Sequence, residues 1–241
     1  MLIIYGFVAE VSISKLFLAG VGPGIMLILL FSSYIALWAL RHPERAPRDD
    51  ARLPMATMLR QLGELLPMAA LIGFVMASMY LGIATATEAA SVGVLGALIL
   101  MAIHRVLSFE AFKAAVLSSV KLSTMILFLL IAAAYLTKAM GYSGIPDAIA
   151  EWVVGQRLGF VGFMILLTAM YILLGLFLDG VSMLVLTAPV VLPSINAMGI
   201  DPIWFGIYVV LVVEMSLITP PVGLNLFVLQ SMVNKDLFTV A

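Results

Sequence analysis

Residues 158–197 form a nearly continuous apolar segment, LGFVGFMILLTAMYILLGLFLDGVSMLVLTAPVVLPSINA. A helix of about 20 residues already crosses the roughly 30 Å hydrocarbon core of a bilayer, so this segment is too long for one crossing. Its one charged residue, Asp179, is followed by Gly180 near the middle of the segment. We therefore predict a re-entrant helical hairpin over about 158–197, with two full crossings as the alternative.

The next apolar segment, residues 203–232, is also too long for a single crossing and contains Thr219-Pro220-Pro221-Val222-Gly223. Tandem prolines remove two backbone donors and clash with the preceding turn, so a helix cannot continue through them unbroken. The glycine that follows can adopt conformations closed to other residues. The pattern predicts a broken helix over about 203–232.

The composition of the whole chain is that of a membrane protein. Of its 241 residues, 64% are hydrophobic and 10% are charged, against about 45–50% and 25% in soluble domains. The net charge of −1 offers no basic surface for nucleic acid, and the absence of cysteine excludes disulfides and thiolate metal sites. We expect no transition-metal site and no enzyme, because the sequence shows neither a metal-ligand cluster nor a nucleophile–base pair.

The apolar runs are continuous and rich in leucine and alanine, which favours helices over a transmembrane barrel. The expected fold is an all-α polytopic membrane protein. Mixed composition also predicts one helix on each membrane surface, at about 109–121 in the cytoplasm and 146–154 outside. The remaining runs of helix length are residues 16–40, 66–83, 89–103 and 122–140.

Cationic side chains predict the orientation, because cytoplasmic loops carry an excess of Lys and Arg. The long polar stretch 41–63 holds five arginines. With this stretch in the cytoplasm, nine of the 12 cationic side chains lie inside, and Lys15, Lys138 and Arg157 lie outside. Both ends of residues 158–197 then face outside.

Candidate binding residues lie where polarity or broken backbone enters the apolar segments. Intramembrane carboxylates usually face a cavity or a partner. A broken helix offers free carbonyls to a cation and a helix N-terminus to an anion. The candidate ligand-binding residues are Asp179, Gly180, Ser182, Thr219, Pro220, Pro221, Gly223 and Asn225, and Ser216 could add a further oxygen; their assignment to sodium and substrate follows from the family resemblance given below. An ordinary polar turn at Asp179 and a simple proline kink are the alternatives.

Four other residues are candidates for a supporting role. Thr85 or Thr87 can cap a helix N-terminus, and Glu88 can complement the helix dipole there; a sodium or gating role is the alternative. Glu214, five residues before the predicted break, could be a buried partner for a cation or a hydroxyl.

Several motifs invite comparison with a known family. They are TATEAA (85–90), GLFLDG (175–180), TAPVVLP (187–193), EMSLITPPVGLNLF (214–227) and the N-terminal IIYGFVAEVSISKLFLAGVGPGIML (3–27). Together they resemble the large (M) subunit of tripartite ATP-independent periplasmic (TRAP) transporters over nearly the whole chain, and TPPVGLNLF is the most specific of them.

The resemblance implies a sodium-coupled secondary transporter with two inverted repeats, each contributing a re-entrant hairpin and a broken helix. It implies an organic-anion substrate, a dicarboxylate or a sialic-acid-like compound, delivered by an extracytoplasmic binding protein. A small membrane subunit would be a further partner, and sodium would be the coupling ion with no other cofactor. The implied location is the inner (cytoplasmic) membrane of a bacterium or archaeon, with several crossings of the lipid bilayer.

The resemblance also implies a domain organisation. Residues 1–15 would be the tail of a preceding repeat and the junction, 16–65 the junction helix and a cytoplasmic loop, and 66–241 a second repeat, incomplete at its C-terminus. We therefore expect a fragment, a truncated product or one part of a split subunit, which does not transport alone. The alternative functions are a binding-protein-independent anion–sodium symporter and a non-transporting structural or assembly segment.

Overall fold

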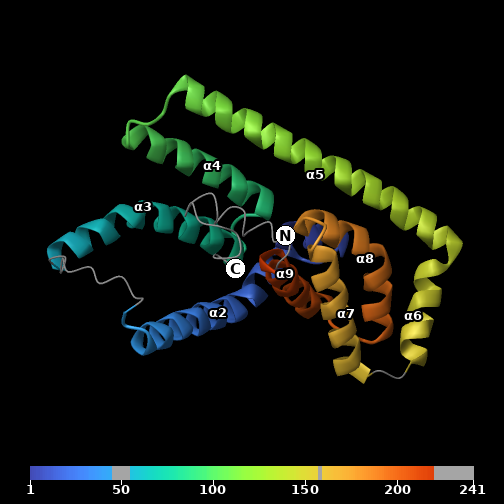
Figure 1. The fold of residues 1–241 in the computed structure, drawn as a ribbon. Coiled ribbons are helices and arrows are strands. Elements are labelled where there is room, and N and C mark those ends of the chain that lie inside the picture. Colours follow the sequence, from blue (N-terminus) through green and yellow to red (C-terminus); the bar gives the residue numbers. More distant parts are fainter. Residues whose placement is uncertain (45–54, 157–158, 220–241) are drawn as a thin grey trace. The chain divides into compact units, whose positions relative to one another are not determined.

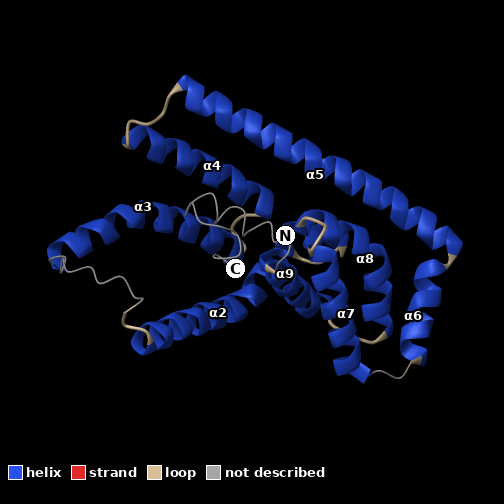
Figure 2. Ribbon diagram, viewed as in Figure 1, coloured by secondary structure: helices blue, strands red, loops and turns tan. Residues whose placement is uncertain are grey.

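The computed structural model describes residues 1–44, 55–156 and 159–219. Every regular element in these residues is an α-helix (Figure 2). Four of the described helices are long and apolar enough to cross a membrane, and they are Ile13–Arg41, Ala86–Ile103, Phe109–Ser143 and Gly180–Ala197. The predicted all-α polytopic membrane fold is confirmed.

The chain divides into two compact units. Unit 1 holds the described residues of Met1–Ala19 and Ser118–Ala241, and unit 2 holds those of Gly20–Leu117. Helices α2 (Ile13–Arg41) and α5 (Phe109–Ser143) each contribute residues to both units. The division by repeats into 1–15, 16–65 and 66–241 stays a prediction.

Unit 2 contains the packed helix pair α3 (Met55–Tyr80) and α4 (Ala86–Ile103). Gly96 of α4 faces Leu71 of α3 so closely that an added Cβ would overlap the leucine side chain. Helices that pack in lipid rely on such small residues, because lipid is as apolar as leucine and provides no hydrophobic drive. Helix α3 spans Met55–Tyr80, so residues 66–80 of the predicted run at 66–83 form its C-terminal part and residues 81–83 lie beyond its end.

Helix α5 joins two elements that the sequence pattern predicts separately, the surface helix at 109–121 and the crossing at 122–140. The two are one continuous helix of 35 residues, Phe109–Ser143. No glycine or proline occurs between residues 109 and 140 to interrupt it. At 1.5 Å per residue it is about 50 Å long, well beyond the roughly 30 Å hydrocarbon core.

Unit 1 is built around a helical hairpin that packs on a third helix (Figure 1). The hairpin arms are α7 (Gly159–Gly175) and α8 (Gly180–Ala197), and the third helix is α9 (Pro202–Ile218). The short helix α1 (Leu2–Val8) packs against α8 and α9, and α6 (Ile145–Gly155) packs along α8. The largest fully buried side chains of this core are Tyr5, Leu16, Phe163, Tyr171, Met183, Leu184, Ile195, Phe205 and Val209.

Hydroxyl groups tie the arms of this core together. Tyr171 of α7 and Thr187 of α8 are hydrogen-bonded at 2.9 Å, and Thr168 of α7 and Tyr208 of α9 at 2.6 Å. The Tyr5 hydroxyl of α1 donates to the Pro202 carbonyl of α9 at 2.6 Å. Within the described residues, every buried side-chain N or O atom has a hydrogen-bond partner, as an apolar interior requires.

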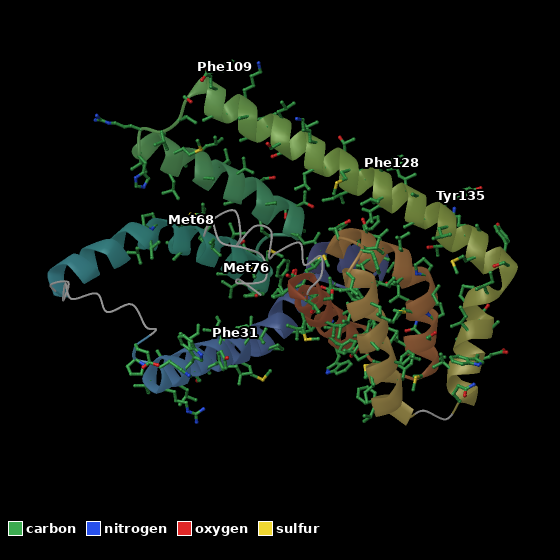
Figure 3. All side chains as sticks on the ribbon, viewed as in Figure 1. Phe31, Met68, Met76, Phe109, Phe128 and Tyr135 are labelled. Carbon is green, nitrogen blue, oxygen red and sulfur yellow. The ribbon has the colours of Figure 1, made fainter. Side chains whose placement is uncertain are left out.

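The long helices α2 and α5 differ from this core, because most of their large apolar side chains are exposed. Phe31 of α2 is 62% exposed, and Phe128 and Tyr135 of α5 are 72% and 79% exposed. Figure 3 shows these side chains pointing away from their own helices. Apolar surfaces of this extent fit contact with lipid or with other membrane helices.

Replacing Gly206 by alanine is expected to lower the melting temperature. An added Cβ would lie 2.7 Å from Tyr5 Cδ1 and 2.8 Å from Leu16 Cδ2, both on buried side chains. Overpacking costs about 1–3 kcal/mol, and the gain in helix propensity returns up to about 1 kcal/mol of that.

Gly22→Ala in α2 is the matched control, since a Cβ there meets no atom within 4 Å. It carries the same gain in propensity without the overlap. Thermal unfolding of the purified protein in detergent measures both variants, and equal melting temperatures would contradict the close packing of Tyr5 on Gly206.

Candidate ion and substrate site

The turn between α7 and α8 is a capped helix N-terminus. Asp179 is the N-cap of α8 and has an extended backbone. Its Oδ2 accepts hydrogen bonds from the backbone N–H groups of Val181 at 3.0 Å and Ser182 at 3.1 Å, and the Ser182 hydroxyl donates to Oδ1. The structure thus brings Asp179, Gly180 and Ser182 together at one tip. We call residues 176–182 the hairpin tip.

Two glycines let the hairpin tip approach the end of α9. A Cβ on Gly180 would lie 3.1 Å from Val213 Cγ1 and 3.3 Å from Leu217 Cδ1. A Cβ on Gly175, the last residue of α7, would overlap Cβ and Oγ of Ser216. The tip is therefore seated on the last turns of α9.

Ser216 serves this packing and is not an open oxygen ligand. Its side chain is 0% exposed, and its hydroxyl donates to the Val213 carbonyl at 2.6 Å. The sequence pattern offers it as a possible coordinating oxygen. The described contacts instead place it in the interface between α7 and α9.

Helix α9 ends at Ile218, directly before the residues that the proline pair predicts to be broken. Thr219 is its C-cap and has an extended backbone (φ −78°, ψ 127°). Its N–H donates to the Ser216 carbonyl at 3.1 Å and its hydroxyl to the Met215 carbonyl at 2.9 Å. The other predicted residues of this segment, Pro220, Pro221, Gly223 and Asn225, lie outside the described residues.

The site therefore combines one carboxylate with the ends of three helices. The last four carbonyls of a helix have no partner within that helix. Thr219 already donates to two of them in α9, and N–H groups of the hairpin tip donate to the Leu173 and Leu174 carbonyls of α7. The other end carbonyls of α7 and α9 can present oxygen atoms. The Asp179 carboxylate can accept about four hydrogen bonds or coordinate bonds, and the hairpin turn uses three of them. Oxygen ligands and a negative charge suit a hard cation such as sodium.

The supporting candidates are placed individually. Thr85 is the N-cap of α4, and it forms a capping box with Glu88. Glu88 Oε2 accepts from the Thr85 N–H at 2.8 Å, and Thr85 Oγ1 accepts from the Glu88 N–H at 3.3 Å. This geometry favours the capping interpretation over a sodium or gating role. Thr87 is exposed.

Glu214 of α9 is exposed, so the expectation that it is buried is wrong for the described residues. Its neighbours Val213, Ser216 and Leu217 form the buried face of α9. Successive residues of a helix are about 100° apart, which turns Glu214 away from the centre of that face. A role as partner to a cation stays a prediction.

Sequence reasoning missed the contact between Gly175 and Ser216 as a feature of the site. Gly175 opens the GLFLDG motif, and Ser216 lies in the last turns of α9. A glycine and a small polar residue close to helix ends are weak signals alone, because nothing in the sequence pairs them. Only the packing of α7 on α9 shows their relation.

The family profile described as "Tripartite ATP-independent periplasmic transporter, DctM component" matches residues 1–241. The chain belongs to this family. The TRAP large-subunit resemblance carried by the motifs is thereby confirmed, and so is the expectation that the chain is not an enzyme, because its relatives are named transporter permeases.

Three relatives from this TRAP family have names that refer to different substrates. The chain is 35% identical to a C4-dicarboxylate TRAP transporter large permease protein DctM from Pseudomonas aeruginosa. The aligned residues make up 98% of this chain and 55% of that protein. It is 28% identical to an isethionate TRAP transporter permease protein DctMQ from Oleidesulfovibrio alaskensis (98% and 37%). It is 30% identical to an ectoine/5-hydroxyectoine TRAP transporter large permease protein UehC from Ruegeria pomeroyi (94% and 52%).

The chain thus spans about half the length of the large permease relatives it matches. The activity, substrates and partners of such a whole permease are therefore proposals for this chain. Membership of the family and the multi-pass membrane character stand independently of them.

Replacing Asp179 by alanine is expected to lower the free energy of unfolding by about 0.5–2 kcal/mol, the usual cost of losing an N-cap. Asp179→Asn is the matched control, because asparagine caps helices about as well as aspartate. Thermal or denaturant unfolding of the purified protein measures both. Equal destabilisation by the two variants would show that the negative charge matters at this position and the cap does not.

Proposed function

We propose that this TRAP chain forms part of the membrane pathway of a sodium-coupled secondary transporter that imports a small organic anion. The observation that carries the proposal is the hairpin tip, with its carboxylate, seated on the end of α9. Sodium-coupled transporters place ion and substrate sites at such helix ends near the bilayer midplane. Family membership supports the same function.

Sodium is the proposed coupling ion, and no other cofactor is needed. Asp179 supplies the negative charge, and the ends of α7 and α9 supply carbonyl oxygens. Thr219, Pro220, Pro221, Gly223 and Asn225 would complete the sodium and substrate region, with Gly180 and Ser182 on the side of the tip. The organic anion would bind beside the ion.

The proposed substrate class is a small organic anion, such as a dicarboxylate or a sialic-acid-like compound. The named substrates of the relatives include C4-dicarboxylate, isethionate and ectoine. This variety is the reason for leaving the class broad.

The proposed partners are a small membrane subunit and an extracytoplasmic substrate-binding protein. The word "tripartite" in the family description supports a three-part assembly. The proposed location is the inner membrane of a bacterium or archaeon. The alternatives are an anion–sodium symporter that works without a binding protein and a membrane segment with a structural or assembly role.

Proteoliposomes test the transport proposal. They contain the full transporter complex that includes this chain, with the binding protein added outside and a labelled C4-dicarboxylate as the first probe. We expect an inward sodium gradient to drive uptake several-fold above an equal choline gradient, because the ion stabilises the substrate-binding arrangement of the tip.

Equal uptake in sodium and choline would contradict the coupling. Sodium-driven uptake without the binding protein would favour the simpler symporter. If the dicarboxylate gave no uptake, sialic acid and isethionate would be tried as further probes. No uptake of any of the three would favour the structural alternative.

Cysteine labelling tests the predicted orientation of the chain in the membrane. The chain contains no native cysteine, so a single introduced cysteine is its only labelling site. Lys113 of α5 and Glu151 of α6 are both exposed. The charge distribution places Lys113 inside and Glu151 outside. A membrane-impermeant maleimide added to intact cells with a permeable outer envelope should label Glu151→Cys and leave Lys113→Cys unlabelled until the membrane is opened. The reverse pattern would overturn the orientation.

A further inference from the structure

The contact between Gly175 and Ser216 joins the two helix ends that frame the candidate site. Gly175 is the last residue of α7, and the hairpin tip follows it directly. Ser216 lies three residues before Thr219, where α9 ends. Both residues are buried. The relative position of the tip and of the end of α9 therefore depends on how closely these two residues approach.

The contact between Gly175 and Ser216 leaves no room for an added atom. A Cβ on Gly175 would overlap both side-chain heavy atoms of Ser216, and the next neighbour, Met183 Cε, would lie 3.3 Å away. The hydrogen bond from Ser216 Oγ to the Val213 carbonyl holds the hydroxyl against its own helix. An added methyl group at residue 175 can therefore be accommodated only if α7 and α9 move apart.

The neighbouring contact at Gly180 is softer. A Cβ there would first meet Met1 Cε at 2.7 Å, which is the end of a flexible side chain, and then Val213 Cγ1 at 3.1 Å. Methionine adapts readily to changes of shape around it. Of the two glycine contacts of the tip, Gly175 with Ser216 is the one that fixes the spacing.

We infer that Gly175 and Ser216 are positioning residues for sodium binding, which set the distance between the hairpin tip and the end of α9. This inference rests on the proposed function. Neither residue coordinates the ion; together they hold the oxygens of the tip and those of α9 at the spacing the ion needs. Binding sites require their ligands within about 0.5 Å of the working geometry, so a spacer of one methyl group is enough to disturb them.

The test measures sodium binding without the substrate. The transporter complex that contains this chain is purified in detergent, and its melting temperature is followed as sodium chloride replaces choline chloride at constant ionic strength. A ligand that binds only the folded state raises the melting temperature with its concentration. The midpoint of the sodium response reports the apparent affinity.

Gly175→Ala is expected to raise the sodium midpoint by about tenfold, because misplacements on the order of 1 Å cost up to roughly 100-fold in preorganised sites. The double variant Gly175→Ala with Ser216→Gly removes the two atoms that the new methyl group overlaps. It should restore the midpoint to within about twofold of the wild-type value, since the spacing returns. This reciprocal exchange separates spacing from the chemistry of either residue.

Gly206→Ala is the matched control for general damage. Gly206 makes an equally tight contact in the same unit, with Tyr5 near the start of α9, away from the tip. It should lower the melting temperature and leave the sodium midpoint unchanged. Should Gly175→Ala fail to fold, Ser216→Gly alone opens a gap at the contact and is expected to raise the midpoint by about threefold or more.

Three results would overturn the inference. They are an unchanged midpoint in a folded Gly175→Ala or Ser216→Gly variant, a double variant no better than Gly175→Ala, and a midpoint shift in Gly206→Ala as large as that in Gly175→Ala. If the wild-type protein shows no sodium-specific response, the proposed sodium coupling fails and this inference fails with it. A normal wild-type response with unshifted variants removes the inference alone.

Discussion

The tightest helix contact at the candidate site is that of Gly175 with Ser216. Because Gly175 has no side chain, the end of α7 can lie directly on Ser216 of α9. Lipid gives membrane helices little reason to associate, so close packing and hydrogen bonds must hold them together. Thr168 and Tyr208 form a hydroxyl pair between α7 and α9, and Tyr171 and Thr187 form another between α7 and α8. The hairpin and α9 are thus fixed to one another by shape and by a few directional bonds.

Because the buried polar groups of the core are already hydrogen-bonded, polar groups that can bind a ligand are expected at the helix ends. Along the described parts of α7, α8 and α9, the buried hydroxyls are already paired. The last carbonyls of α7 and α9 have no partner within their own helices, and the contact of Gly175 with Ser216 brings these two helix ends together. A ligand that prefers oxygen gains most at this position, while the apolar core offers it nothing.

The sequence predicted most of the helices, because the length of an apolar run is enough to predict a helix that crosses the membrane. Asp179-Gly180 and the Thr219-Pro220 step predicted the two ends correctly, since an N-cap and a proline act on their immediate neighbours. It did not predict that residues 109–143 form one helix, although the absence of glycine and proline from residues 109–140 was a usable signal. The Gly175–Ser216 contact was beyond prediction, because it pairs residues 41 positions apart through packing.

The placement of Asp179 also gives a physical reason for coupling under the proposed function. An uncapped helix N-terminus carries roughly half a positive charge and would attract an organic anion directly. Here the carboxylate of Asp179 accepts the first N–H groups of α8 and cancels that attraction. An anion that approaches the tip alone meets a negative charge. A sodium ion bound between the tip and α9 offsets this charge, so the favourable order is ion first and anion second.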